Sequence, residues 1–449
     1  MKKQDNSRAG RLGWRTWAVL GLVMLARQGA TAQTVPDREP LRQCGSVAIE
    51  QQLQSRFSAR GPQREQLNNQ IRTWLEQPPA AQARARADVI YRIPVVVHVV
   101  HNTANSTIGG SNNPNISDAQ IQSQIQVLNE DYRRVAGTPG GTSTNPLAAD
   151  MKIEFFLATT DPTGQPSTGI TRHFTQKATY DLFNDLFLLS SIAYWPSNRY
   201  LNIWTVTLSN RNFLGFGQFP TAADTLQGLG QTDERIDGVV IDHRYFGRRT
   251  GTVTSTLYCC GRTTTHEIGH WLGLIHPTGD TFCGTDYVAD TPPTEALNET
   301  DRCDPIFSRC RTSVVTRNQI ENYMDYTPDA CMNLFTNGQR DRVQAVLALS
   351  PRRVQLIQSL TALPETERLT VLVSPNPANA ETTARVQFKG QQSFQAVLYN
   401  SAGRLMNSQS FAATLSRQIT LALTGFQAGV YILRVNTPGE TVSQRIVVR

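Results

Sequence analysis

One short stretch of the sequence places three histidines at spacings that suit a metal ion. His266 and His270 are four residues apart, so on a helix they lie on one face, one turn from each other. Both imidazoles can therefore reach a single ion. Gly273 stands where a helix can end in a left-handed turn, and the reversed chain would return His276 as a third ligand. The fourth position then stays open for water.

A carboxylate accompanies these candidate ligands. Glu267 follows the first histidine, so its side chain projects beside the ion rather than into the ligand set. From there it can take a proton from water at the open position, which makes it the candidate general base. The pattern H-E-x-x-H alone also arises by chance. The glycine and the third histidine are two further independent requirements, and they favour a zinc site.

The string from His266 to His276 resembles the metzincin clan of zinc endopeptidases, whose pattern is H-E-x-x-H-x-x-G-x-x-H followed by a Met-turn. The segment 322–326, N-Y-M-D-Y, matches such a turn. The resemblance implies that Met324 packs as an apolar floor beneath the three histidines, although a single methionine is normally core filler. It also implies that Tyr326 lies near the metal and donates its hydroxyl to the developing oxyanion.

Charge and the N-terminus limit the other functions. The 449 residues carry a net charge of +7 without a basic run or interleaved aromatic residues, which argues against nucleic-acid binding. Basic residues, the apolar run Trp17–Ala26 and then Ala30-Thr31-Ala32 predict a signal peptide over residues 1–32. A membrane anchor is the alternative, but the run is short for a span. We expect an exported, soluble mature protein without a transmembrane segment, in a compartment that permits disulfides.

The segment after the predicted signal peptide reads as a removable prosegment. Residues 33–86 are rich in Gln, Arg and Ala and end in an arginine-marked linker. The chain has an odd number of cysteines, seven, and Cys44 lies in this segment. Its thiolate could occupy the open zinc position and keep the enzyme latent, which resembles a cysteine switch. An incidental free thiol is the alternative.

Residues 87–355 are expected to form the catalytic domain. The expected elements are a buried strand at Ile93–Val100, a helix from Ser117 to about Arg134, a strand at Met151–Ala158, a helix at about Tyr180–Tyr194, a strand at Tyr200–Leu208 and a closing helix from Thr336 to about Leu349. This order predicts an α/β upper half. The metzincin resemblance implies that a strand shortly before the zinc motif borders the cleft and pairs its free edge with extended substrate, and one of the segments 215–220 and 237–242 is expected to be that strand. His98, His101 and His243 are expected to have structural roles.

The segments around Cys283, Cys303, Cys310 and Cys331 resemble one metzincin family, the pappalysins, and within it the small prokaryotic members. The resemblance covers about residues 40–355. It implies an α+β catalytic domain with a mixed twisted sheet, helices and a loop-rich lower half. It also implies the disulfides Cys283–Cys310 and Cys303–Cys331, which would crosslink a region with few long apolar runs.

The same resemblance implies structural calcium in the lower half. The Asp286 carboxylate, the Thr291 side chain and backbone carbonyls such as that of Val288 are oxygen donors of the kind that calcium prefers. An acidic loop without such an ion is usually a solvated loop.

Two positions depart from the family pattern. Members that cleave before Arg or Lys carry an acid just ahead of the cysteine that corresponds to Cys331, whereas this chain has Ala330 there and Asp329 one residue earlier. The sequence therefore leaves a preference for basic residues in doubt. The pair Cys259-Cys260 just before the zinc motif has no family counterpart, and it could be reduced, form a vicinal disulfide or bridge another chain.

The C-terminal region has a different composition. Residues 356–368 are expected to form a linker, and alternating strands such as 396–399, 429–435 and 445–449 predict a small all-β sandwich over residues 369–449. These segments resemble the sorting domain of proteins exported by the bacterial type IX secretion system. The resemblance implies export through the periplasm, with that machinery as a partner, and a secreted or surface-attached product. A carbohydrate- or surface-binding module is the alternative.

These features predict a secreted bacterial zinc endopeptidase, made as a latent zymogen, that hydrolyses peptide bonds in protein substrates. One catalytic zinc and structural calcium are the expected cofactors. The rival from another class is a non-catalytic surface adhesin that keeps a metalloprotease fold. Because Glu267 and all three histidines are present, the enzyme is the favoured hypothesis.

Overall fold

The computed structural model describes residues 39, 41–77, 90–223, 233–311, 314–359, 368–389, 392–414 and 416–449. The predicted signal peptide and the end of the predicted prosegment, residues 78–86, lie outside the described residues. Residues 41–77 are called the N-terminal segment below.

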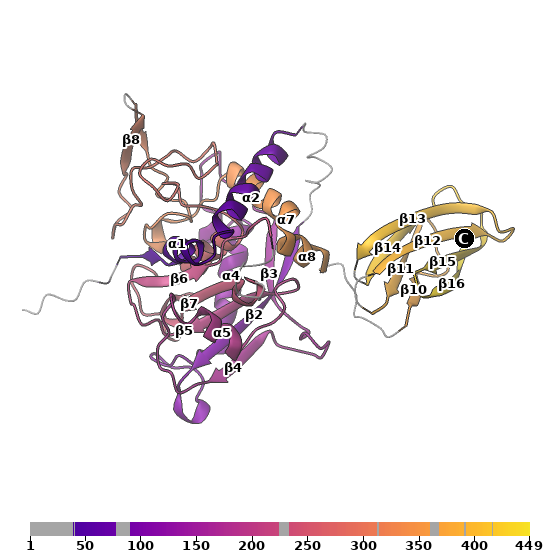
Figure 1. Cartoon of the computed structure of the whole chain (residues 1–449), viewed down its shortest axis with the longest axis horizontal. Coiled ribbons are helices and arrows are strands. Elements are labelled where there is room, and N and C mark those ends of the chain that lie inside the picture. The colour runs from indigo at the N-terminus through magenta and orange to yellow at the C-terminus, as the bar shows by residue number, and fades with distance from the viewer. Residues whose placement is uncertain are drawn as a thin grey trace, which may run out of the picture. The chain divides into compact units, whose positions relative to one another are not determined.

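A seven-stranded mixed sheet forms the centre of the part that carries the histidines (Figure 1). Its strands are β1 (Gln43–Cys44), β2 (Tyr91–His101), β3 (Ile153–Leu157), β4 (Ile170–Phe174), β5 (Leu201–Val206), β6 (Phe213–Gly217) and β7 (Gly238–Asp242). The order is β1-β6-β7-β5-β2-β3, and β4 also pairs with β2. Among the described strands of this sheet, β6 and β7 are the only pair that is antiparallel. The predicted buried strand is thus confirmed as β2, whose β-branched residues face helices or loops on both sides.

Helices cover the two faces of this sheet. On one face, α4 (Asp118–Tyr132) and α6 (Arg262–Trp271) bury their apolar residues against alternate valines of β2, together with α8 (Pro351–Ser359). On the other face, α5 (Leu186–Ile192) and α1 (Ser46–Arg56) pack against β5 and β6. Ser117 begins α4 as predicted, because its hydroxyl accepts the N–H of Gln120 at 3.2 Å.

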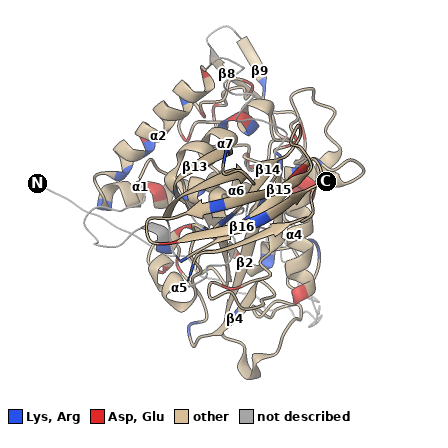
Figure 2. Ribbon diagram, turned by 90° about the vertical axis from the view of Figure 1, so that its right-hand side faces the viewer, with Lys and Arg blue, Asp and Glu red and all other residues tan. Residues whose placement is uncertain are grey.

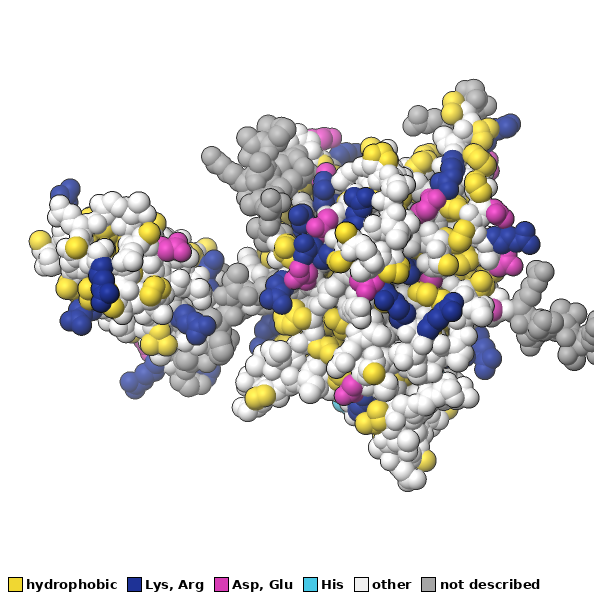
Figure 3. Space-filling view, turned by 180° about the vertical axis from the view of Figure 1, so that it is seen from behind, with side chains coloured by type: hydrophobic (Ala, Val, Ile, Leu, Met, Phe, Trp, Pro, Cys, Tyr) yellow, Lys and Arg dark blue, Asp and Glu magenta, His cyan; other side chains and the backbone are white. Residues whose placement is uncertain are grey.

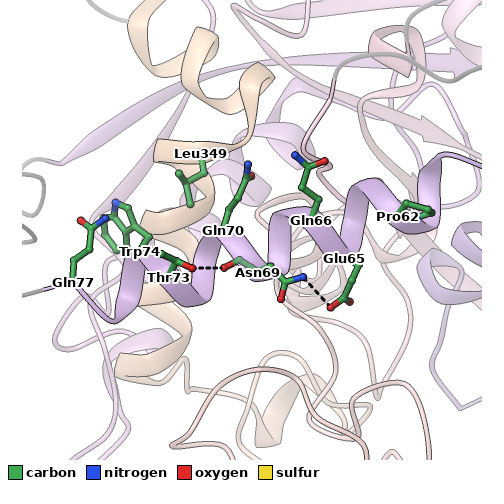
Figure 4. A pocket seen from close by; sticks show the side chains of 9 residues that line it. All are labelled: Pro62, Glu65, Gln66, Asn69, Gln70, Thr73, Trp74, Gln77 and Leu349. Carbon is green, nitrogen blue, oxygen red and sulfur yellow. Dashed lines mark hydrogen bonds between the residues drawn. The ribbon is translucent and has the colours of Figure 1, made fainter.

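The N-terminal segment contains two helices that the sequence did not predict. α1 is followed by α2 (Arg60–Leu75), which packs Leu67 and Ile71 on α7 (Asn337–Leu349) (Figure 1). A groove of about 750 Å³ follows α2 (Figure 4). Along it, Thr73 donates to the Asn69 carbonyl and Asn69 donates to Glu65. Six of the nine lining residues are polar, and the lining comes from α2, from Gln77 just after it and from the end of α7.

Two predicted boundaries are wrong. The helix expected at Tyr180–Tyr194 is only the seven residues of α5, because the Asp181 carboxylate accepts two nearby N–H groups and holds residues 181–184 in a turn. The expected linker also begins too early. α8 continues to Ser359 because the side chain of Leu356 is fully buried in the main core.

The region between α6 and α7 is rich in loops, as expected. Its described residues contain only the hairpin of β8 (Phe307–Arg311) and β9 (Val314–Arg317) and one short 3-10 helix. The structure contains the disulfides Cys283–Cys310 and Cys303–Cys331. Most of this region, residues 277–321 as far as they are described, contributes no side chain to the apolar cores, and the crosslinks lie in or next to it.

The C-terminal region is all-β, as predicted. One sheet has the order β10-β11-β14 and the other the order β13-β12-β15-β16. The strands are β10 (Thr370–Ser374), β11 (Glu381–Gln387), β12 (Gln392–Asn400), β13 (Leu405–Thr414), β14 (Arg417–Ala422), β15 (Gly429–Asn436) and β16 (Thr441–Val448). In β15, Tyr431, Leu433 and Val435 face a separate apolar core that both sheets share. Apolar residues at every second position of a strand therefore form the core of this sandwich.

Charged side chains of both signs are distributed over the structure. In Figure 2 basic and acidic residues are scattered over the ribbon, and on the face seen in Figure 3 they are interspersed. Within the part of the chain that the structure describes, no helix combines the length and the apolar character that crossing a membrane requires.

Candidate metal centre and catalytic site

Helix α6 carries two of the three histidines, and its end returns the third. The helix stops at Trp271, and Gly273 has a φ of 89°, a left-handed conformation that favours glycine. A Cβ on Gly273 would also lie 2.7 Å from a methyl carbon of Val346. The predicted glycine turn is therefore present, and it brings His276 back beside the helix.

The three imidazoles converge on one point. The Nε2 atoms of His266, His270 and His276 lie 3.1, 3.1 and 3.2 Å from one another. Zinc–nitrogen distances of about 2.05 Å at tetrahedral angles would place such nitrogens about 3.3 Å apart. The three residues therefore fit a zinc ion.

Each imidazole has a partner for its other nitrogen. The Nδ1 atoms of His266 and His270 lie 2.8 Å from the carbonyl oxygens of Tyr323 and Leu274, and that of His276 lies 2.7 Å from the Asp280 carboxylate. A hydrogen on Nδ1 leaves the Nε2 lone pair directed at the common centre. Burial lowers the pKa of His270 to about 3, so this ring is neutral, the form that binds metal.

The predicted Met-turn lies under the same helix. Met324 is fully buried, and a Cβ on Gly269 would lie 2.3 Å from its sulfur. The methionine therefore packs directly against the backbone of α6 between the two ligands. Tyr326 lies beside the centre, with its ring centroid 5.2 Å from that of His276.

Glu267 is buried next to the histidines, and two side chains of the N-terminal segment bind it. Its Oε2 atom accepts the hydroxyl of Ser46 at 2.9 Å and the thiol of Cys44 at 3.2 Å. Burial raises the pKa of Glu267 to about 7, and these two hydrogen bonds act in the opposite direction. The carboxylate therefore has a defined position beside the three rings.

The N-terminal segment covers the catalytic groups. Cys44 and the three histidines offer four candidate ligand atoms that lie within 4.8 Å of one another. The N–H of Cys44 donates to the Tyr326 hydroxyl at 3.0 Å. Strand β1 pairs with β6, so the strand edge expected to receive substrate is occupied by the chain itself. Of the two candidate edge segments, β6 lies next to β1 and would be the edge strand without it, whereas β7 lies inside the sheet.

Arg42, immediately before β1, extends into a buried site. Its guanidinium forms an ion pair with Asp329 and lies over the Tyr258 ring, 4.9 Å from the centroid. The other oxygen of Asp329 accepts the N–H groups of Cys260 at 2.8 Å and Arg262 at 3.2 Å, at the start of α6. The acid next to Ala330 therefore faces the catalytic region despite its shifted place in the sequence.

The remaining sequence candidates lie elsewhere. Thr291 donates to Asp286 and to the Val288 carbonyl, so the three candidate calcium ligands meet in one loop. Cys259 and Cys260 are both free thiols. His98, His101 and His243 are buried in or beside the sheet and lie outside the four-residue cluster found among the described residues.

Sequence reasoning missed three residues that shape the site. Arg42 and Ser46 are each two residues from Cys44, so their closeness to the candidate thiol was the available signal. Asp280 lies four residues after His276, and a carboxylate is a frequent partner of a zinc-bound imidazole.

A cavity of about 240 Å³ lies beside the centre, with Val47, His276 and Tyr326 in its wall.

Comparisons with known proteins agree with this geometry. Residues 190–348 match the family model described as pregnancy-associated plasma protein-A, and residues 372–449 match a secretion system C-terminal sorting domain. An extracellular metalloprotease of Pyricularia oryzae is 31% identical over 265 residues, which cover 57% of this chain and 75% of the relative.

Two solved structures are also similar. A complex of mirolysin is 42% identical, with a TM-score of 0.51, over 60% of this chain and 96% of that one. A promirolysin variant from Tannerella forsythia is 37% identical, with a TM-score of 0.57, over 71% of this chain and 98% of that one. The chain therefore belongs to the pregnancy-associated plasma protein-A family, as a secreted zinc endopeptidase that is made as a zymogen and carries a C-terminal sorting domain.

Proposed function

We propose that His266, His270 and His276 hold the catalytic zinc and that Glu267 is the general base of peptide hydrolysis. The observation that supports this most is the convergence of three Nε2 atoms beside a buried carboxylate. Each ring also has an acceptor at Nδ1, which leaves Nε2 free to bind metal.

The residues around the zinc divide the chemistry among them. Zinc, when bound, supplies Lewis acidity that activates water and polarises a peptide carbonyl. Glu267 takes the proton of the attacking water and later passes it to the leaving amine. Tyr326 donates its hydroxyl to the developing oxyanion, which lowers the energy of the tetrahedral state. In the zymogen this hydroxyl is engaged by the Cys44 N–H.

The N-terminal segment is proposed to impose latency at four points at once. The Cys44 thiolate takes the fourth zinc position, and Ser46 holds Glu267. Ser46 also accepts the Gly217 N–H at 2.8 Å, and β1 covers the edge of β6. Substrate can enter only after this segment leaves. The reactive carboxylate, the tyrosine hydroxyl and the strand edge become available together.

Arg42 indicates which substrate side chain the enzyme accepts. We propose that the site vacated by Arg42 binds an arginine of the substrate next to the cleaved bond, with Asp329 as its partner. The support is a buried ion pair two residues from the thiol at the metal centre. In a peptide library cut by the processed enzyme, arginine should be enriched directly after the cleavage site. A profile without enrichment of basic residues there would reject Asp329 as the determinant.

A structural calcium ion is proposed in the loop 286–291. The Asp286 carboxylate, the Val288 carbonyl and the Thr291 hydroxyl supply oxygen ligands on one short segment. Bound calcium would stabilise the folded loop by mass action. Melting of the inactive Glu267→Ala protein should shift to lower temperature in EGTA and recover with added calcium. Asp286→Asn should remove that response.

The assignment of catalytic roles is tested with the processed protein on denatured protein substrates. Glu267→Ala should bind zinc but lose cleavage by several orders of magnitude, because the base is gone. Tyr326→Phe should lower kcat more than it raises KM, because its hydroxyl acts on the transition state. Cleavage that survives in Glu267→Ala at the wild-type rate would show that another site or a contaminant is responsible.

A further inference from the structure

The end of helix α4 holds both segments that build the metal centre. Asp131 is buried, and its carboxylate accepts the Tyr323 hydroxyl at 2.9 Å and the Thr265 hydroxyl at 2.8 Å. Arg262, the first residue of α6, lies 3.4 Å from the same carboxylate. One side chain from an early part of the sequence therefore contacts the zinc helix twice and the Met-turn once.

These contacts lead to one ligand in particular. Tyr323 uses its hydroxyl on Asp131, while its carbonyl oxygen lies 2.8 Å from Nδ1 of His266. Thr265 immediately precedes His266, and its own carbonyl accepts the hydroxyl of Tyr132 at 3.0 Å. Both the backbone that carries His266 and the group that orients its ring are therefore fixed by the last two residues of α4.

The other two ligands are supported differently. His270 faces the Leu274 carbonyl, and His276 faces the Asp280 carboxylate. Both of these acceptors lie within four residues of the histidine they orient. His266 differs because the Tyr323 carbonyl comes from the Met-turn, and that residue is held in turn by Asp131.

We infer that Asp131 is a positioning residue that fixes the ring of His266 through Tyr323 and Thr265 and thereby raises the affinity of the site for zinc. This inference rests on the proposed role of His266 as a zinc ligand. Loss of a direct partner of a ligand commonly costs 10- to 100-fold in metal affinity. Asp131 acts one hydrogen bond further out, so we expect about a tenfold loss when it is changed.

A purely structural role must be separated from this one, because Asp131 is also the buried partner of Arg262. Asp237 provides a matched control. It is buried, pairs with Arg353 at 2.7 Å and accepts the indole N–H of Trp271 on the same zinc helix at 2.9 Å. Within the described part of the chain, its side-chain partners are Trp271, Arg352 and Arg353, and the carbonyls that face the histidines belong to other residues. Asp237→Asn should therefore reduce stability without changing how the three rings are oriented.

The experiment measures zinc affinity and melting temperature in the full chain, with Glu267→Ala in every protein to prevent self-cleavage. Competition with a chelator of known affinity gives the zinc dissociation constant for Asp131→Asn, Tyr323→Phe and Asp237→Asn. Tyr323→Phe removes the hydroxyl that reaches Asp131 but keeps the carbonyl that faces His266. We expect about tenfold weaker binding for the first two variants, little further loss when they are combined, and unchanged binding for Asp237→Asn.

The cobalt-substituted proteins give a second readout. Asp131→Asn and Tyr323→Phe should shift the visible absorption bands of bound cobalt, whereas Asp237→Asn should not. Unchanged zinc affinity and unchanged bands in Tyr323→Phe would overturn the inference, and this variant decides alone if Asp131→Asn does not fold. If the parent protein itself binds no stoichiometric zinc, the proposed metal ligands are wrong, which is a different outcome.

Discussion

Gly269 shows at the scale of one residue how little space separates the zinc helix from the Met-turn. We predict that Gly269→Ala weakens zinc binding and lowers the free energy of unfolding by about 2 kcal/mol, because the added Cβ would lie 2.3 Å from Met324 Sδ. Gly61 in α2 is the matched control. An added Cβ there meets its nearest atom at 3.6 Å, so Gly61→Ala should leave stability equal or slightly higher. Urea unfolding of both variants in the inactive protein makes the comparison.

His98 gives a prediction about pH. Burial lowers its pKa to about 4, and its two nitrogens lie 2.7 Å from Thr171 Oγ1 and 2.9 Å from Asn202 Oδ1. Below about pH 6.5 the His98 ring is protonated in the unfolded chain but stays neutral in the folded protein. The contribution of His98 to the free energy of unfolding is therefore fully present above about pH 6.5, and about 3 kcal/mol of it is lost as the pH falls toward 4.

The measurement follows the free energy of unfolding between pH 7 and 4 in Glu267→Ala protein with and without His98→Gln. The variant should be less stable at pH 7 and should lose less stability on acidification. Equal slopes for the two proteins would show that His98 does not titrate on unfolding in this range.

The placement of two candidate ligands was predictable from the sequence, because helix periodicity alone puts His266 and His270 on one face. Their supporting partners were not. The Tyr323 carbonyl and the Asp131 carboxylate reach α6 from 57 and 134 residues away, measured to the residues they contact. Only the folded chain brings such distant groups together. The contact between Asp280 and His276 was easier to predict, since the two residues are four positions apart.

Strand β1 and the start of α1 are the smallest unit that explains latency. We predict that Cys44→Ala produces a prematurely active precursor, because the proposed zinc ligand of the zymogen is lost. Ser46→Ala should give a smaller effect, since it frees Glu267 but leaves the thiol in place. Premature activity is measured as cleavage of a reporter peptide during expression. The inactive control is the double variant that carries both Cys44→Ala and Glu267→Ala. A Cys44→Ala precursor as latent as the parent would contradict the cysteine switch.

The helices α1 and α2 show why the sequence could not predict every element. α2 places only Leu67 and Ile71 in a core, and most of its other residues are polar, so its periodic signal is weak. Its stability comes from packing on α7 rather than from its own sequence. By contrast, the β-branched run of β2 and the capped start of α7 carried strong local signals, and both were predicted.

At the scale of the whole molecule, the chain combines a zymogen with an export module. The sandwich has its own apolar core, so it can be removed without opening the core around the sheet. We predict that deletion of residues 369–449 causes the protease to accumulate in the periplasm. Fractionation with an antibody against the catalytic domain checks this. Normal export together with weaker attachment to surfaces would instead favour a binding module.

The disulfide Cys303–Cys331 bears on when the region around Asp329 becomes crosslinked during export. Cys331 lies two residues from Asp329, the acid that both caps the zinc helix and pairs with Arg42. In the reducing cytoplasm this disulfide does not form, so a newly made chain lacks the crosslink beside the site that is proposed to bind arginine. Oxidation after translocation completes the crosslink. The oxidising compartment would thus provide a second control on activity, independent of the proposed block of the metal by the Cys44 thiol.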